Sequence, residues 1–118
     1  MGKLLYGDSE IDIEFEDRAL THNQIVVGAK LRRGESFFFS WKDDIEVGDG
    51  RSSIWLDRGI PLYFKYSGGK VPTINREWID ALTLSANMAG GLQFSAEPNG
   101  ETNPPKSNVA PRVENPRP

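Results

Sequence analysis

The first part of the chain alternates between apolar and polar side chains with the period of a β-strand. Ile11, Ile13 and Phe15 alternate with acidic residues, and alternate residues of a strand point to opposite faces of a sheet. The apolar residues 3–6 lie before a turn at residues 7–9. The sequence therefore predicts an N-terminal β-hairpin with one buried face.

From Asp17 the period becomes helical. Leu20 and Val27 share one stripe, Asp17 is an N-cap candidate and Gly34 is a stop signal. Gly28 weakens such a helix by about 1 kcal/mol relative to alanine, which we interpret as a sign of close packing. The last turn carries three basic side chains: Lys30, Arg32 and Arg33.

Residues 37–42, 52–57 and 60–67 have the aromatic and β-branched composition of strands. Asn75 then begins a second helix, and Gly90 and Gly91 end it before a short strand at residues 92–95. The predicted fold class is α+β: an antiparallel sheet with two helices in the order ββαβββαβ. From Glu97 the chain is rich in proline and poor in apolar side chains, which predicts a single domain at residues 1–96 and a disordered, dispensable tail at residues 97–118.

Composition restricts the functions that the chain can have. The net charge is −3, so attraction of a polyanion requires a local basic patch. Cysteine is absent, which excludes thiolate catalysis and fits a cytoplasmic protein. No apolar run approaches the ~20 residues of a membrane span, so we expect no membrane partner.

Alternation along the three central strands predicts a core face and an opposite face. The opposite face collects aromatic and basic side chains: Phe38, Lys42, Trp55, Tyr63 and Lys65. Aromatic rings beside cations are typical of a surface on which nucleic-acid bases stack, or of a protein-binding hot spot. An alternative is that the N-terminal hairpin or a second copy of the chain covers this face.

The basic residues at the end of the first helix, Lys30, Arg32 and Arg33, are candidates for phosphate binding. Their alternative role is to complement the helix dipole on a solvated face. His22, the single histidine, is interpreted as a surface or capping residue rather than a general base.

Catalytic and metal-binding motifs are incomplete in this sequence. The acidic loop 43–50 lacks the ligand spacing of a calcium loop, and none of the serines lies in a Gly-x-Ser-x-Gly elbow. We therefore predict no catalytic residue, no metal and no cofactor.

Three runs of the sequence resemble a family of short actinobacterial proteins: GAKLRRGESFFFSW (28–41), GDGRSSIWL (48–56) and NREW (75–78). Many members carry the label "ATP-dependent DNA ligase", and otherwise they form a domain of unknown function. The resemblance covers residues 1–96 and implies the label without a mechanism. Ligases of that class attach AMP to the lysine of Lys-x-Asp-Gly-x-Arg, whereas around Asp49 this chain has Val47 at the lysine position and Ser52 at the arginine position.

The leading hypothesis is a cytoplasmic, non-catalytic binding module whose aromatic-basic face engages nucleic acid or a DNA-processing protein. One alternative is a ligase-like or ligase-accessory protein, which rests on the family label. Another is a self-associating structural protein that forms a homodimer through the same face.

Overall fold

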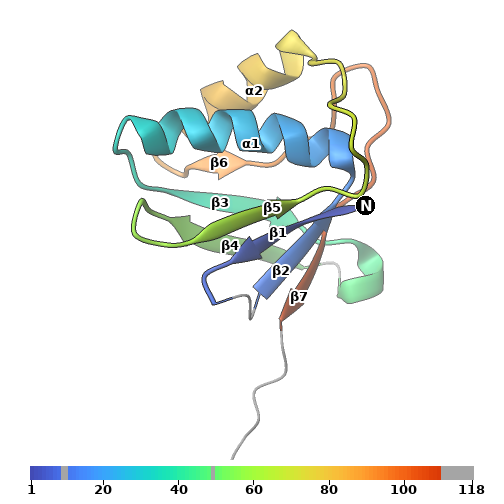
Figure 1. Ribbon diagram of the computed structural model, residues 1–118, viewed down its shortest axis with the longest axis horizontal. Helices are drawn as coiled ribbons and strands as arrows, with labels where there is room; N and C mark the ends of the chain where they lie inside the picture. Colours follow the sequence, from blue (N-terminus) through green and yellow to red (C-terminus); the bar gives the residue numbers. More distant parts are fainter. Residues whose placement is uncertain (9–10, 49, 110–118) are drawn as a thin grey trace, which may run out of the picture.

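The computed structural model describes residues 1–8, 11–48 and 50–109. Two α-helices and the strands follow one another in an α+β arrangement, and the predicted order ββαβββαβ is confirmed as far as the last predicted strand. Both helices lie on the same side of the strands (Figure 1). The elements are β1 (Gly2–Tyr6), β2 (Ile11–Phe15), α1 (Asp17–Arg32), β3 (Phe37–Lys42), the short 3-10 helix η1 (Ile45–Val47), β4 (Arg51–Leu56), β5 (Leu62–Lys65), α2 (Arg76–Ala86), β6 (Leu92–Gln93) and β7 (Lys106–Val109).

The strands are divided between two sheets. The first has the order β5-β1-β2-β7 and is antiparallel throughout. The second has the order β4-β3-β6, in which β3 is antiparallel to β4 and parallel to β6. The strand β5 therefore pairs with β1, and not with β4 as its position in the sequence suggests.

A turn after β4 sends the chain from one sheet to the other. The carboxylate of Asp57 accepts a hydrogen bond from the Gly59 N–H at 2.9 Å. The Pro61 carbonyl then accepts one from the Gly7 N–H, also at 2.9 Å. In β5, Phe64 lies opposite Leu4 of β1. Cross-strand apolar pairs of this kind stabilise a sheet, so β1 offers β5 a favourable partner.

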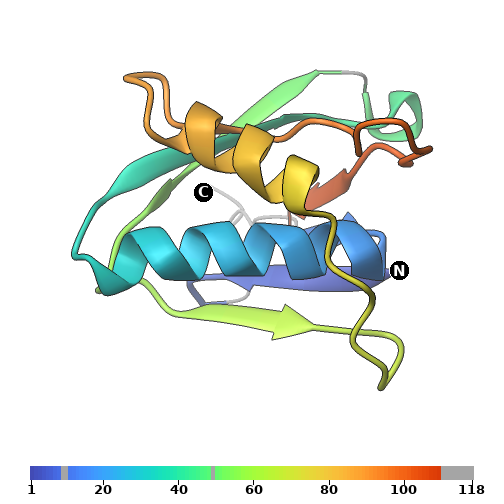
Figure 2. The ribbon, with the colours of Figure 1, turned by 90° about the horizontal axis from the view of Figure 1, so that it is seen from above.

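One hydrophobic core lies between the helices and both sheets. Phe15 of β2 stacks on Phe39 of β3, with ring centroids 6.0 Å apart and planes 8° apart. The two helices pack against each other and lie side by side when seen from above (Figure 2). Trp78 and Leu82 project from α2 into this core, where both are fully buried. Phe15 and Phe39 thus join the two sheets into a single folded unit.

Of the two N-cap residues predicted from the sequence, one caps its helix and the other does not. Asn75 caps α2 as predicted, because its side-chain oxygen accepts a hydrogen bond from the Trp78 N–H. Asp17 does not cap α1, whose N-cap is Glu16. Its carboxylate instead accepts hydrogen bonds from the N–H groups of Ser67 and Gly68, which fixes the loop after β5.

The prediction of a disordered tail from Glu97 is wrong for the part that the structure describes. Lys106–Val109 form β7, which pairs with β2 (Figure 1). The backbone N–H of Ser107 donates to Asp43 at 2.9 Å, and Lys106 forms a 2.6 Å ion pair with Glu46. Backbone pairing and polar anchors therefore hold a segment that has few apolar side chains. Residues 110–118 lie outside the described residues.

Among the described residues, no helix combines the length and the apolar character that crossing a membrane requires.

Candidate functional site

The outer face of β3 and β4 presents three rows of paired side chains. In the antiparallel register, Phe38 lies opposite Trp55, Ser40 opposite Ser53 and Lys42 opposite Arg51. We call these six residues the platform. Successive rows are two residues apart, so the aromatic and basic rows are separated by about 13 Å along the strands. The platform is thus aromatic at one end, hydroxylic in the middle and basic at the other end.

The aromatic row keeps much of its surface in contact with solvent. Phe38 is 48% exposed and Trp55 is 41% exposed. Their rings meet edge to face, with centroids 4.9 Å apart and planes 68° apart, a favourable geometry for an aromatic pair. The Tyr6 hydroxyl donates a 2.7 Å hydrogen bond to the Trp55 carbonyl and ties β4 to β1. The described part of the N-terminal hairpin, residues 1–8 and 11–15, leaves these rings exposed.

The middle row is hydrogen-bonded within itself, since the hydroxyl oxygens of Ser40 and Ser53 lie 2.7 Å apart. The basic row follows, and both Lys42 and Arg51 are exposed. A hollow of about 690 Å³ lies at this end and includes Gln93 of β6 in its wall. Cations beside a hollow on an open sheet face suit an anionic group such as a phosphate.

A second hollow, of about 470 Å³, lies at the aromatic end between Phe38, Trp55 and the residues after α2. It depends on a close approach of two backbone segments. Gly91 has a φ of +84°, and a Cβ atom there would lie 2.4 Å from the Phe38 carbonyl oxygen. Only glycine fits this position, and the result is that β6 and its preceding turn pack directly against β3.

The predicted aromatic-basic face is therefore brought together only in part. Phe38, Lys42 and Trp55 share the platform. Tyr63 and Lys65 are exposed as alternation predicts, but they lie on β5 in the other sheet. The prediction was wrong on this point because it assumed that β5 follows β4 in one sheet.

The three basic residues at the end of α1 do not form a cluster. Lys30 is only 5% exposed, and its ammonium donates to Asn87 at 2.9 Å and to Glu35 at 3.2 Å. Arg33 forms a 3.0 Å ion pair with the same Glu35. Arg32 lies in the wall of a groove on the flank of α1. Lys30 thus connects α1 to the end of α2, which the sequence pattern did not indicate.

His22 is buried rather than on the surface. Its Nε2 accepts a 2.8 Å hydrogen bond from the Asn75 N–H, so the proton is on Nδ1, which donates to the Arg18 carbonyl at 2.7 Å. The ring packs on Trp78 with centroids 4.6 Å apart. His22 connects α1 to the start of α2 through Nε2, while Nδ1 is hydrogen-bonded within α1.

The acidic loop after β3 uses its first carboxylate inside the fold. Asp43 is buried and accepts hydrogen bonds from Trp41 Nε1, Ser52 Oγ and Ser107 N. Burial alone would raise the pKa of Asp43, but these hydrogen bonds outweigh it and hold that pKa below its ordinary value. Within the described residues, no group of three acidic or histidine side chains is arranged to hold a metal ion. Asp49 lies outside the described residues.

Sequence reasoning missed Arg51. Its partnership with Lys42 follows from the hairpin register, which depends on the conformation of the loop between β3 and β4. The outward alternation of Ser53 and Trp55 was a usable signal, because Arg51 continues it by one further step.

Searches of curated proteins and of solved structures find no significant match to the chain. A family model for a domain of unknown function (DUF7882) matches residues 1–97, which end just before the segment that leads to β7. The chain therefore belongs to this family of domains of unknown function.

Proposed function

We propose that the chain binds single-stranded nucleic acid on the platform. The observation that carries this proposal is the register of β3 and β4, which puts an exposed aromatic pair and an exposed basic pair on one open sheet face. Every base has a flat face that stacks on an aromatic ring, and each phosphate attracts a cation. The platform supplies both partners within about 13 Å.

Each row of the platform has a separate role in this proposal. Phe38 and Trp55 stack on bases, while Lys42 and Arg51 contact the phosphates near the 690 Å³ hollow. Stacking is tolerant of sequence, so binding is expected to depend little on base identity. Because the whole chain carries a charge of −3, attraction is local and falls steeply with added salt.

A fluorescence-anisotropy titration with short single-stranded oligonucleotides at two salt concentrations tests the proposal. Trp55→Ala is expected to weaken binding by about 1–3 kcal/mol at both salt concentrations, through lost stacking. Arg51→Gln is expected to reduce the slope of log K against log salt by about 0.7, the value for one phosphate of a single strand.

The other sheet provides matched controls. Tyr63 is an exposed aromatic residue and Lys65 an exposed cation, but both lie on β5. Tyr63→Ala and Lys65→Gln are expected to leave binding nearly unchanged. An equal loss in the platform and control variants, or no binding at low salt, would refute the proposal.

Self-association through the same face is the second candidate, because Phe38 and Trp55 are large, exposed apolar residues there and exposed apolar surface can mark a protein–protein interface. Light scattering separates the two functions. A stable dimer that Trp55→Ala dissociates favours self-association, whereas a monomer that binds oligonucleotides favours the nucleic-acid function.

A further inference from the structure

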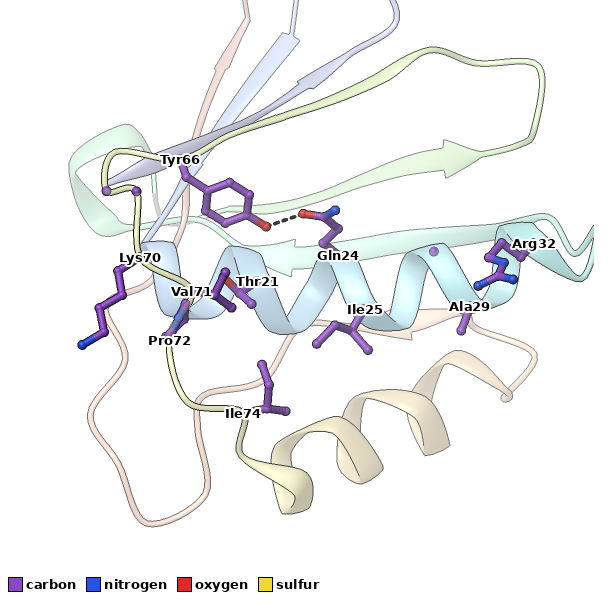
Figure 3. A pocket seen from close by; sticks show the side chains of 13 residues that line it. Thr21, Gln24, Ile25, Ala29, Arg32, Tyr66, Lys70, Val71, Pro72 and Ile74 are labelled. Atoms are coloured by element: carbon purple, nitrogen blue, oxygen red, sulfur yellow. Dashed lines mark hydrogen bonds between the residues drawn. The ribbon is translucent and has the colours of Figure 1, made fainter.

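A groove of about 740 Å³ runs along the flank of α1 that faces away from the core. One wall is a helical stripe of α1, and the other is the loop that leads from β5 to α2 (Figure 3). The stripe spans Thr21 to Arg32. At 1.5 Å per residue it is about 16 Å long. The volume lies within the range of small-molecule sites, about 300–1,000 Å³.

Small residues in the middle of the stripe create the hollow. Gly28 and Ala29 both line it. Among the described residues, a Cβ atom built on Gly28 would have no atom from outside the neighbouring turns of its own helix within 4 Å, so the glycine borders open space. The interpretation of Gly28 as a site of close packing is therefore wrong. A methyl group at this position would project into the groove without a clash.

The lining is mainly apolar. Ile25, Val71 and Ile74 line the groove and are each more than 40% exposed, an arrangement that leaves apolar surface in contact with water. The Tyr66 hydroxyl donates a 2.5 Å hydrogen bond to Gln24, which holds these two lining side chains together (Figure 3). An apolar body is thus the favoured occupant of the groove.

The charges at the groove favour an anionic group at one end of that body. Arg32 and Lys70 are its charged lining residues, and none of the described residues that line it is acidic. Figure 3 shows Lys70 pointing away from the groove. On that side the carboxylate of Asp17 also binds the N–H of Gly68, which disfavours a second anion there. Arg32 at the opposite end is the better partner for a carboxylate.

We propose that this groove binds a free, single-chain fatty acid, with the chain along Gly28 and Ala29 and the carboxylate at Arg32. This site is independent of the platform, because it lies on α1 and the β5–α2 loop. Titration calorimetry with monomeric decanoate, dodecanoate and tetradecanoate tests it. Each additional methylene is expected to tighten binding about fourfold, which corresponds to ~0.8 kcal/mol, until the groove is full.

Substitutions in the groove separate the chain contact from the carboxylate contact. Gly28→Leu is expected to keep the fold and abolish binding, and Gly28→Ala, which adds one methyl group, is expected to weaken it. Arg32→Gln is expected to weaken binding about tenfold, the loss of one charge-assisted hydrogen bond. Ala81→Leu, on an exposed position of α2 outside the groove, is the control that keeps near-normal affinity.

The location is checked by amide chemical shifts, which are expected to change at Gly28, Ala29 and Gly69 on addition of dodecanoate. Three results would overturn the proposal. They are an affinity that does not change with chain length, full binding by Gly28→Leu, and binding to vesicles of anionic phospholipid without binding of the monomeric acids. None of these results bears on oligonucleotide binding at the platform, so the two proposals fail independently.

Discussion

Replacing Glu97 with glutamine is expected to destabilise the fold, although Glu97 lies where the sequence predicts the disordered tail to begin. Its carboxylate accepts two hydrogen bonds from Arg18, at 2.7 and 2.6 Å, and a third from Asn75 Nδ2 at 2.8 Å. Its own N–H donates to Thr102 at 2.9 Å. Glu97 thus joins the first turn of α1, the start of α2 and the segment that leads to β7.

The size of the effect follows from the pKa of Glu97. The hydrogen bonds from Arg18, and then that from Asn75, lower this pKa from 4.5 to about 2. At about 1.36 kcal/mol per pKa unit, the difference corresponds to at most about 3.4 kcal/mol. The Glu97 side chain is 13% exposed, but Arg18 is 37% exposed and regains water when the pair is broken. We therefore expect Glu97→Gln to lower the free energy of unfolding by about 1.5 kcal/mol.

The destabilisation is also expected to depend on pH. Because the folded-state pKa of Glu97 is depressed, its contribution is fully present above about pH 4.5 and is lost as the pH falls toward about 2. The difference between the wild type and Glu97→Gln should therefore be constant near neutral pH and shrink through this window. Other carboxylates titrate in both proteins, so the difference isolates Glu97.

Urea denaturation followed by tryptophan fluorescence, repeated between pH 7 and pH 2.5, measures this difference. At neutral pH the melting temperature should also fall by about 6 °C. Glu101→Gln is the matched control, because Glu101 is an exposed acid on the same segment and the substitution removes the same charge. Equal stabilities of the two variants, or a difference that persists undiminished at pH 2.5, would refute this account of Glu97.

Three further predictions concern the core, the C-terminal segment and the ligase label. Asn23 is buried on α1, and neither polar atom of its side chain has a hydrogen-bond partner within the described part of the chain. Asn23→Ala is therefore expected to raise the free energy of unfolding by about 1 kcal/mol. Leu82→Ala should lower the same quantity by about 2–5 kcal/mol. A lower free energy of unfolding for Asn23→Ala would show that the Asn23 amide is hydrogen-bonded in the folded protein. A chain that ends at Ala96 should lose at least as much stability as Glu97→Gln, because it also lacks β7. A chain that ends at Val109 keeps every described contact, so it should melt at the same temperature as the full chain. Incubation with ATP and Mg²⁺ should add no AMP by intact-mass analysis, because Val47 occupies the position of the attacking lysine, and an adduct would revive the ligase hypothesis.

Local patterns in the sequence were sufficient for most of the elements and for the direction of many side chains. The alternation in β3 and β4 correctly separated the buried Phe39 and Trp41 from the exposed Phe38 and Trp55. The Asn75 cap was likewise visible in the sequence. Such features depend on residues only a few positions apart, so a short stretch of sequence determines them.

Tertiary structure decided which elements became neighbours. The strand β5 pairs with β1, and β7 pairs with β2, although long stretches of chain separate the partners. A polar, proline-containing segment carries no periodic signal. Its order comes from backbone pairing with β2, from the Asp43 carboxylate, which accepts the Ser107 N–H, and from the Glu97 carboxylate, which binds Arg18 and Asn75. Sequence patterns alone cannot reveal such partners.

The candidate sites divide in the same way. The sequence pattern predicted that Phe38, Trp55 and Lys42 share a face. The register of the β3–β4 hairpin places Arg51 on that face as well, whereas the pairing of β5 with β1 places Tyr63 and Lys65 in the other sheet. Lys30 and Arg32 are close in sequence, yet one is buried against α2 and the other lines a groove. The sequence thus determined which residues are chemically suited to bind a ligand. The packing of α1 against α2 and the loop after β5 decided which of them share a surface, because these contacts join residues far apart in the chain.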